Sequence, residues 1–300
     1  MTKIVVAGGL NFYPDQIERL NKLGDMIYYS DCASTHEEWL ERVKDADIIC
    51  SGKFGLLQKV YELNNKFITV PFVAVSWANI AKLKERNITL ANAPGCNKYA
   101  VSEWIIGMMI NLFRKLPELI NTLKPNTTDT VISGLKDKEV CILGRGNIGN
   151  RVGTVCEALE MQVTYFKKGD NLKDKTTNAD VIIDCLGQNS TTKNILNKDF
   201  FFSLKKGAFF ITVTGTEIYD TDAIISALDN NILAGAAMDA GSIPIGDTKN
   251  PYYLKLQQHP KILSTPHIAF NTDVTARIAN DIIIDNVESY LKGHPKNIIN

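Results

Sequence analysis

The sequence predicts an α/β protein with two doubly wound parallel sheets, each in a domain of its own. Short apolar runs alternate with helical stretches from the first residues onward, which is typical of a parallel sheet covered by helices. The chain has 300 residues, more than one domain usually holds, so it can bury two cores. The alternation breaks at Pro94 and Gly95 and resumes after the polar residues 124–129. We therefore expect one sheet on each side of this break.

The first part of the chain supplies strands and helices in turn. Its longest apolar segment, residues 99–113, contains Glu103 and Asn111 and is shorter than the roughly 20 apolar residues of a membrane span. We expect this segment to form a buried helix between the domains. Expected strands are residues 3–7, 26–29, 47–50, 72–75 and 89–91, and expected helices are residues 15–23, 36–43 and 98 to about 116.

The second part continues the alternation to residue 264 and ends in a long helix. No strand follows this helix, so we expect it to return to the first domain. The predicted domains are then residues 1–97 with 272–300, and residues 98–271. Expected strands are residues 139–143, 163–166, 181–185, 208–213, 234–238 and 262–264, and expected helices are residues 150–160 and 273–291.

A glycine-rich turn, Gly144-Arg145-Gly146-Asn147-Ile148-Gly149, lies where the strand at residues 139–143 leads into a helix. Gly144 permits a tight turn, Gly146 leaves no Cβ between the backbone and a pyrophosphate, and Gly149 lets the helix pack close to the strand. Free N–H groups at the helix start would hold the phosphates. The turn predicts a dinucleotide-binding domain of the Rossmann type.

Composition argues against several classes of protein. Acidic and basic residues are equally numerous, 33 of each, which disfavours a nucleic-acid or membrane partner. The chain begins with an apolar strand and not with a secretory signal, so we expect a cytoplasmic protein. We expect no metal. The six cysteines form no C-x-x-C pair and are expected to be reduced core residues; they are Cys32, Cys50, Cys96, Cys141, Cys156 and Cys185.

Seven short blocks together resemble the D-isomer-specific 2-hydroxyacid dehydrogenase family over nearly the whole chain. The resemblance implies a flavodoxin-like substrate domain made of both chain ends, a Rossmann cofactor domain between them, an active site in the cleft between the domains, and a homodimer formed through the cofactor domain. The blocks are residues 75–80 (VSWANI), 92–97 (NAPGCN), 100–103 (AVSE), 144–149 (GRGNIG), 207–208 (GA), 235–239 (GAAMD) and 265–268 (TPHI).

The family transfers a hydride between C4 of a nicotinamide and C2 of a 2-hydroxy or 2-keto acid, with a histidine as proton donor. The resemblance assigns this role to His267, which follows the strand at residues 262–264. A small-molecule substrate is implied. The resemblance implies further contacts besides those of the glycine turn. Cofactor contacts are implied at Leu186, Gly187, Val213, Thr214 and Asp239, and substrate contacts at Lys53, Phe54, Ser76 and Trp77.

Two catalytic positions depart from the family pattern. Gly215 stands where the family has an arginine that binds the substrate carboxylate, and Pro244 stands where it has a glutamate that pairs with the histidine. Loss of comparable electrostatic groups commonly lowers rates by about 10² to 10³, so ordinary 2-keto acids are not the expected substrates. Two alternatives stay open. Lys53 could supply a cation, or Thr212, Thr214 and Thr216 could line a pocket for a substrate without a carboxylate.

The cofactor is expected to be NADP(H) in preference to NAD(H). NAD-dependent members have an acidic residue at the end of the second strand, where it accepts hydrogen bonds from the ribose hydroxyls. Here the strand at residues 163–166 leads into Lys167 and Lys168, and the next acid is Asp170. Loss of the carboxylate removes repulsion of a 2′-phosphate, and the lysines attract it.

Two hypotheses follow, from different classes. The first is an NADP(H)-dependent oxidoreductase with a divergent substrate, a carbonyl or imine compound without the usual 2-carboxylate. The second is a catalytically silent dinucleotide-binding sensor. His267 favours the enzyme, because a sensor has no need of an imidazole at that position, whereas Gly215 and Pro244 favour the sensor.

Overall fold

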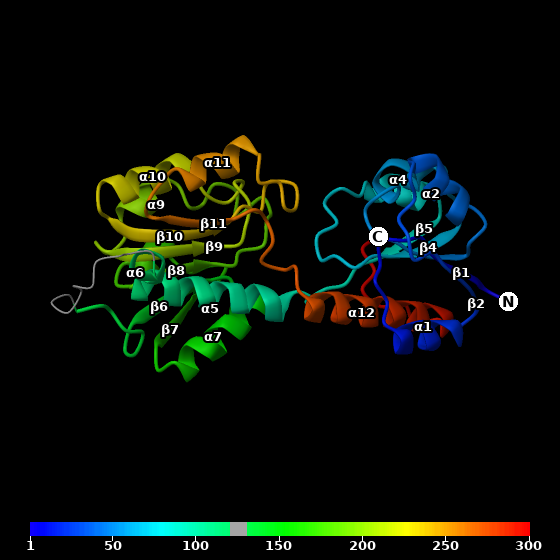
Figure 1. The fold of residues 1–300 in the computed structure, drawn as a ribbon, viewed down its shortest axis with the longest axis horizontal. Coiled ribbons are helices and arrows are strands. Elements are labelled where there is room, and N and C mark those ends of the chain that lie inside the picture. The colour runs from blue at the N-terminus through cyan, green and yellow to red at the C-terminus, as the bar shows by residue number, and fades with distance from the viewer. Residues whose placement is uncertain (121–130) are drawn as a thin grey trace. The chain divides into compact units, whose positions relative to one another are not determined.

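The computed structural model describes residues 1–120 and 131–300, so the polar stretch at residues 124–129 lies outside the described residues. The chain forms two compact units. The first unit comprises Met1–Asn97 and Asn271–Asn300, and the second comprises Lys98–Phe270. Each unit contains one entirely parallel sheet with helices on both faces (Figure 1), which confirms the predicted fold class.

The sheet of the first unit has the strand order β2-β1-β3-β4-β5, the order of flavodoxin-like folds. One face packs on α2, α3 and α4, and the other packs on α1 and α12. The strands are β1 (Lys3–Val6), β2 (Asp25–Tyr28), β3 (Ile48–Cys50), β4 (Lys66–Thr69) and β5 (Ile88–Ala91). The helices are α1 (Pro14–Asn21), α2 (His36–Val43), α3 (Leu56–Lys59), the 3-10 helix η1 (Val60–Glu62), α4 (Ile80–Glu85) and α12 (Asp273–Leu291).

The strand expected at residues 72–75 is wrong, because the fourth strand is β4, six residues earlier in the chain. Phe67, Ile68 and Thr69 are all fully buried, so this run fits between β3 and β5 with both faces covered. Pro71 follows and has no N–H to donate to a neighbouring strand. Residues 72–75 instead form a loop in which Phe72 and Val75 pack on the core and Val73 is exposed.

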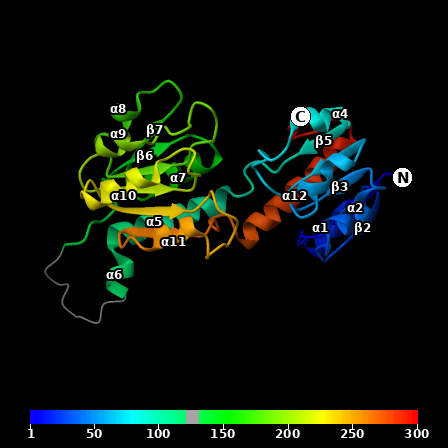
Figure 2. The same ribbon diagram turned by 90° about the horizontal axis from the view of Figure 1, so that it is seen from above.

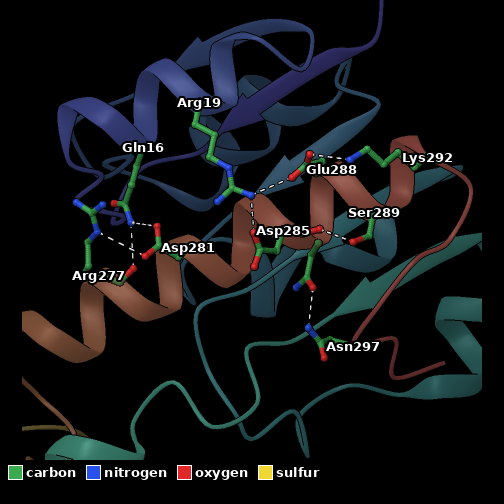
Figure 3. A network of polar contacts seen from close by, with 10 residues as sticks. Gln16, Arg19, Arg277, Asp281, Asp285, Glu288, Ser289, Lys292 and Asn297 are labelled. Atoms are coloured by element: carbon green, nitrogen blue, oxygen red, sulfur yellow. Dashed lines mark hydrogen bonds and ion pairs between the residues drawn. The ribbon is translucent and has the colours of Figure 1, made fainter.

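The C-terminal helix α12 lies beside α1 on one face of the first sheet (Figures 1 and 2). Figure 3 shows the polar contacts between them, among them Arg19 with Asp285 at 2.5 Å and with Glu288 at 2.9 Å. Deeper in the unit, the buried Asn286 amide donates to Thr69 Oγ1 at 3.0 Å and to the Asn92 carbonyl at 2.9 Å. The two chain ends therefore build one unit.

The sheet of the second unit has the order β11-β10-β9-β8-β6-β7, so the chain reverses direction across the sheet between β6 and β8. Ligands of open α/β sheets bind at the carboxyl ends of the strands beside such a reversal. The strands are β6 (Glu139–Leu143), β7 (Gln162–Phe166), β8 (Val181–Asp184), β9 (Ala208–Thr212), β10 (Leu233–Asp239) and β11 (Ile262–Thr265). The helices are α5 (Lys98–Arg114), α6 (Leu116–Ile120), α7 (Asn147–Ala158), α8 (Leu172–Thr176), α9 (Lys198–Phe202), α10 (Thr221–Asp229) and α11 (Pro251–Gln257).

Helices α5 and α7 cover one face of this sheet, and α9, α10 and α11 cover the other (Figure 1). The long helix expected to reach about residue 116 ends at Arg114, because Lys115 adopts a left-handed conformation with a φ of 50°. Among the helices of the described residues, none has both the length and the apolar character of a membrane span. All six cysteines are free, but Cys32 is exposed, so the expected core position is wrong for that residue.

Candidate cofactor and catalytic site

The glycine turn has the geometry that its three glycines require. Gly144 has a φ of 95°, and a Cβ there would lie 2.8 Å from the Cys185 carbonyl oxygen. A Cβ at Gly149 would lie 2.1 Å from the Gly144 carbonyl oxygen, so α7 approaches the strand too closely for a side chain. Gly146 is the N-cap of α7, and the space beside its Cα is open. The first turn of α7 thus leaves room for a phosphate group beside its N–H groups.

Arg145 is held at this turn by two contacts that the sequence did not reveal. Its Nε donates to Asn150 Oδ1 at 3.1 Å, and its guanidinium carbon lies 4.8 Å from the centre of the Tyr165 ring. The Tyr165 hydroxyl fits only beside a glycine at residue 153, because a Cβ there would clash with it. A fourth glycine one helical turn after Gly149 was the available signal for this packing. Asn147 is exposed at the helix start, and Ile148 packs partly on the core.

A pocket of about 510 Å³ opens between the glycine turn, the end of β7 and the loop after β8. Its volume falls in the range of small-molecule sites. Three cationic residues line it, and no acidic residue does. Asp170 instead accepts a hydrogen bond from the Lys167 backbone N–H at 2.9 Å. The lining residues are Gly144, Arg145, Phe166, Lys167, Lys168, Gly169, Leu186, Gly187, Asn189, Thr191, Thr192 and Ile195.

A fully buried acid, Asp184, ends strand β8 and was missed by the sequence reasoning. Its carboxylate accepts hydrogen bonds from Thr212 Oγ1 at 2.9 Å, Thr214 Oγ1 at 2.5 Å and the Leu186 N–H at 3.1 Å. Burial raises the pKa of Asp184 to about 6, although these three bonds act in the opposite direction. The signal was an acid at the end of the apolar run Val181–Asp184.

This network corrects the expectation that Thr212 lines a substrate pocket with Thr214 and Thr216. Thr212 is fully buried, and its hydroxyl is bonded to Asp184. The hydroxyl of the half-buried Thr214 is bonded to the same carboxylate, and Thr216 is bonded to Ser242. Val213, between them, packs partly on the core. Cofactor contacts of Val213 and Thr214 remain predictions.

His267 has a left-handed backbone with a φ of 57°, and its side chain is half-buried. Its Nδ1 lies 2.9 Å from the Ile243 carbonyl oxygen, so Nδ1 carries the proton of this hydrogen bond. Nε2 has no partner among the described residues and is therefore available to a ligand. The partner of the ring is thus the carbonyl of the residue before Pro244, the position at which the resemblance predicts a glutamate. A carbonyl orients the ring but adds no formal charge.

Asp239 holds the turn that carries His267. Its carboxylate accepts hydrogen bonds from Thr265 Oγ1 at 2.6 Å, the Ile268 N–H at 2.9 Å and the Ala269 N–H at 3.0 Å. With an exposure of only 3%, this carboxylate is almost entirely committed to the turn. A contact between Asp239 and a cofactor remains a prediction.

The space beside Gly215 is filled by other side chains. A Cβ at Gly215 would lie 2.5 Å from Glu217 Oε2 and 2.9 Å from Ser242 Oγ. The Ser242 hydroxyl also accepts a hydrogen bond from the Thr216 N–H at 2.7 Å. A carboxylate therefore lies beside the position at which the sequence resemblance predicts an arginine. Nothing in the sequence pattern around Glu217 had indicated this.

The expected substrate residues of the first unit lie in the loops after β3 and β4, which are neighbours in the sheet. Lys53 is exposed, with Nζ 5.5 Å from the centre of the Phe72 ring, and Phe54 is 45% exposed. Ser76 is exposed as well. Trp77 packs partly on the core, and its indole N–H is buried without a partner among the described residues.

Among the described residues, no group of three or more His, Cys, Asp and Glu side chains is arranged to hold a metal ion.

Residues 106–269 match the model of the D-isomer specific 2-hydroxyacid dehydrogenase NAD binding domain. The chain belongs to this family. It is 25% identical to the hydroxypyruvate reductase of Blautia hydrogenotrophica, with 99% of both chains covered. Two solved structures share the fold. An acyclic imino acid reductase in complex with NADPH and D-Arg is 23% identical with a TM-score of 0.83, and D-2-hydroxyisocaproate dehydrogenase is 21% identical with a TM-score of 0.80. The first alignment covers both chains completely, and the second covers 100% of this chain and 99% of the other.

Proposed function

We propose that this protein is an NADP(H)-preferring oxidoreductase that acts on a carbonyl or imine substrate without the usual 2-carboxylate. The observation that carries the cofactor preference is the pocket beside the glycine turn, which Arg145, Lys167 and Lys168 line and no acidic residue lines. A phosphate monoester carries about −1.5 to −2 charges at pH 7. Three cations attract such a group, and an acid at the strand end would repel it.

The second unit is the cofactor-binding part of this proposal, and the first unit is the substrate-binding part. The open space beside Gly146 and the first turn of α7 suit a pyrophosphate. The cofactor, when bound, supplies or accepts the hydride. The similar fold of an acyclic imino acid reductase in complex with NADPH and D-Arg supports the cofactor and an imine group in the substrate; D-Arg itself carries a carboxylate, which the proposed substrate lacks. We also propose a homodimer formed through the second unit.

His267 is the proton donor of the proposal. The Ile243 carbonyl fixes the orientation of the ring and leaves Nε2 free toward a ligand. The protonated ring can donate from Nε2 to the oxygen or nitrogen of the substrate, and the neutral ring can accept the proton in the reverse direction. Gly215 and Pro244 remove the two charged partners of ordinary 2-keto acid reduction, so the substrate differs from the usual one.

Fluorescence titration with NADPH and NADH tests the cofactor preference. We expect NADPH to bind at least tenfold more tightly, which corresponds to about 1.4 kcal/mol. Lys167→Asp is expected to shift the preference toward NADH. Lys206→Asp is the matched control, because Lys206 is also exposed in this unit but does not line the pocket. Equal affinities in the natural protein, or an equal effect of both substitutions, would contradict the proposal.

The occupied space at Gly215 also favours the second candidate, a catalytically silent dinucleotide sensor. Both candidates bind the cofactor, so binding alone does not separate them. Turnover does: the enzyme requires at least one carbonyl, imine, alcohol or amine compound whose conversion changes absorbance at 340 nm. A broad screen with NADPH and NADP⁺ that yields no substrate, together with tight cofactor binding, would favour the sensor.

A further inference from the structure

We infer that Glu217 selects a substrate with a protonated nitrogen, so that this site prefers cationic amines or iminium ions over carboxylates. The inference deepens the proposed function and rests on it. It starts from the carboxylate beside Gly215. Glu217 Oε2 lies 2.5 Å from the position that a Cβ of residue 215 would take, so it occupies the path of any longer side chain there.

The Glu217 carboxylate is available to a ligand. The side chain is exposed, and it has no ion pair or hydrogen bond with any described residue. By contrast, the carboxylate of Asp180 in the same unit is paired with Lys205 at 2.8 Å. A carboxylate that is open to solvent and unpaired attracts a cation or a strong N–H donor.

Glu217 also lies on the edge of the sheet that carries the proposed proton donor. It follows β9, whereas Ser242 and Ile243 follow β10 and His267 follows β11, and these three strands are neighbours. The loop after β10 lies between the two positions in the strand order. Ser242 Oγ lies beside the Gly215 position, and the carbonyl of the next residue, Ile243, accepts the hydrogen bond of His267. Because the carboxyl ends of these parallel strands meet at one edge of the sheet, the inference places the substrate at this edge, with His267 on one side and Glu217 on the other.

The charge at this position decides which substrates bind. A guanidinium at residue 215 would bind a carboxylate through two parallel hydrogen bonds. A carboxylate at the same place repels that substrate and attracts an ammonium or iminium group. The Ser242 hydroxyl can accept a further hydrogen bond from the substrate nitrogen. The substrate class is thus a small amine, or the imine formed from it, with its nitrogen toward Glu217.

Isothermal titration calorimetry with the NADPH-loaded protein tests the inference. The probes are three matched sets of small compounds, built on ethyl, butyl and benzyl groups, each as the amine, the alcohol and the carboxylate. We expect at least one amine to bind at least tenfold more tightly than its alcohol and carboxylate counterparts. If no amine exceeds its counterparts, the inference is wrong.

Two variants locate the effect. Glu217→Gln keeps the size of the side chain and is expected to weaken amine binding at least tenfold without changing alcohol binding. Gly215→Ala is expected to act similarly, because its Cβ displaces the flexible end of Glu217 while the backbone there tolerates a side chain. Glu157→Gln is the control, since Glu157 is an exposed glutamate of α7 without an ion pair among the described residues.

The same titrations separate this inference from the proposed function. Tight NADPH binding with no preference for amines, or an amine preference that Glu217→Gln leaves unchanged, overturns the role of Glu217 alone. Failure of NADPH to bind overturns the proposed cofactor. In that case the amine series is repeated with the unloaded protein. A tenfold preference for an amine that Glu217→Gln removes then supports selection by Glu217, and the lack of such a preference overturns it.

Discussion

Replacing the buried acid Asp184 with asparagine should stabilise the protein at neutral pH and not in acid. Burial raises the pKa of Asp184 from 3.8 to about 6. Between these values the folded state holds a proton that the unfolded chain has lost, so the free energy of unfolding falls as the pH rises through this window. The difference of about 2 in pKa, at 1.36 kcal/mol per pKa unit, amounts to about 3 kcal/mol. Asparagine cannot ionise and escapes this cost.

Urea unfolding at several pH values between 4 and 7.5, followed by circular dichroism, measures the effect on the second unit. Of the total, about 2.5 kcal/mol should accumulate across this range, because the unfolded carboxyl is already partly ionised at pH 4 and the rest of the effect falls below that pH. The asparagine keeps a carbonyl oxygen for the Leu186 N–H, while the Thr212 and Thr214 hydroxyls can accept from its amide. The stability of the variant relative to the natural protein should therefore increase as the pH rises through this window.

Asp180→Asn is the control of opposite sign. Burial alone would raise the pKa of Asp180, but hydrogen bonds from Lys205 and the Glu139 N–H lower it by more, so the net pKa lies below 3.8. That variant should lose stability at neutral pH, and the loss should shrink as the pH falls through the folded pKa. A stability difference between Asp184→Asn and the natural protein that is the same at pH 4 and pH 7.5 would refute the reasoning.

Three further predictions concern the site. Gly146→Val should abolish dinucleotide binding and leave the circular dichroism spectrum unchanged, because the Cβ enters the open space beside α7 and meets no protein atom; unchanged affinity in a titration would contradict it. Pyruvate, glyoxylate and hydroxypyruvate should be reduced with kcat/KM far below the usual range of about 10⁴ to 10⁸ M⁻¹s⁻¹, and efficient turnover of any of them would show that Gly215 and Pro244 are compensated. His267→Asn should lose most turnover of an active substrate at nearly unchanged cofactor affinity and stability, since asparagine tolerates a φ of 57°; retained turnover would remove His267 as the donor.

Much of the fold could be predicted because alternation and turn residues are local features. The glycine turn, the return of the last helix and most strands are readable from the sequence within a few residues. The fourth strand was misplaced because two apolar runs, residues 66–69 and 72–75, compete for one position between β3 and β5. Burial on both faces decides between them, and burial is a property of the assembled sheet.

The side-chain contacts of the site could not be predicted in the same way. Asp184 meets Thr212 and Thr214 about thirty positions later in the chain, and Ser242 meets Thr216 across 26 positions. Those contacts depend on the order of the strands in the sheet, which local sequence patterns do not reveal. The Ile243 carbonyl that orients His267 was equally hidden, because every residue has a carbonyl and its direction follows from the fold of the loop.

The backbone at His267 bears on the choice between enzyme and sensor. A left-handed conformation of a residue other than glycine costs of order 1 to 3 kcal/mol and persists only where its surroundings impose it. Here the Asp239 carboxylate accepts hydrogen bonds from the N–H groups of Ile268 and Ala269, and the Gly246 N–H donates to the Pro266 carbonyl at 2.8 Å. A glycine at residue 267 would adopt this conformation at no steric cost and would not need these hydrogen bonds to hold it. The chain instead keeps an imidazole there, with one nitrogen fixed and the other free, an arrangement that proton transfer uses and cofactor sensing does not require.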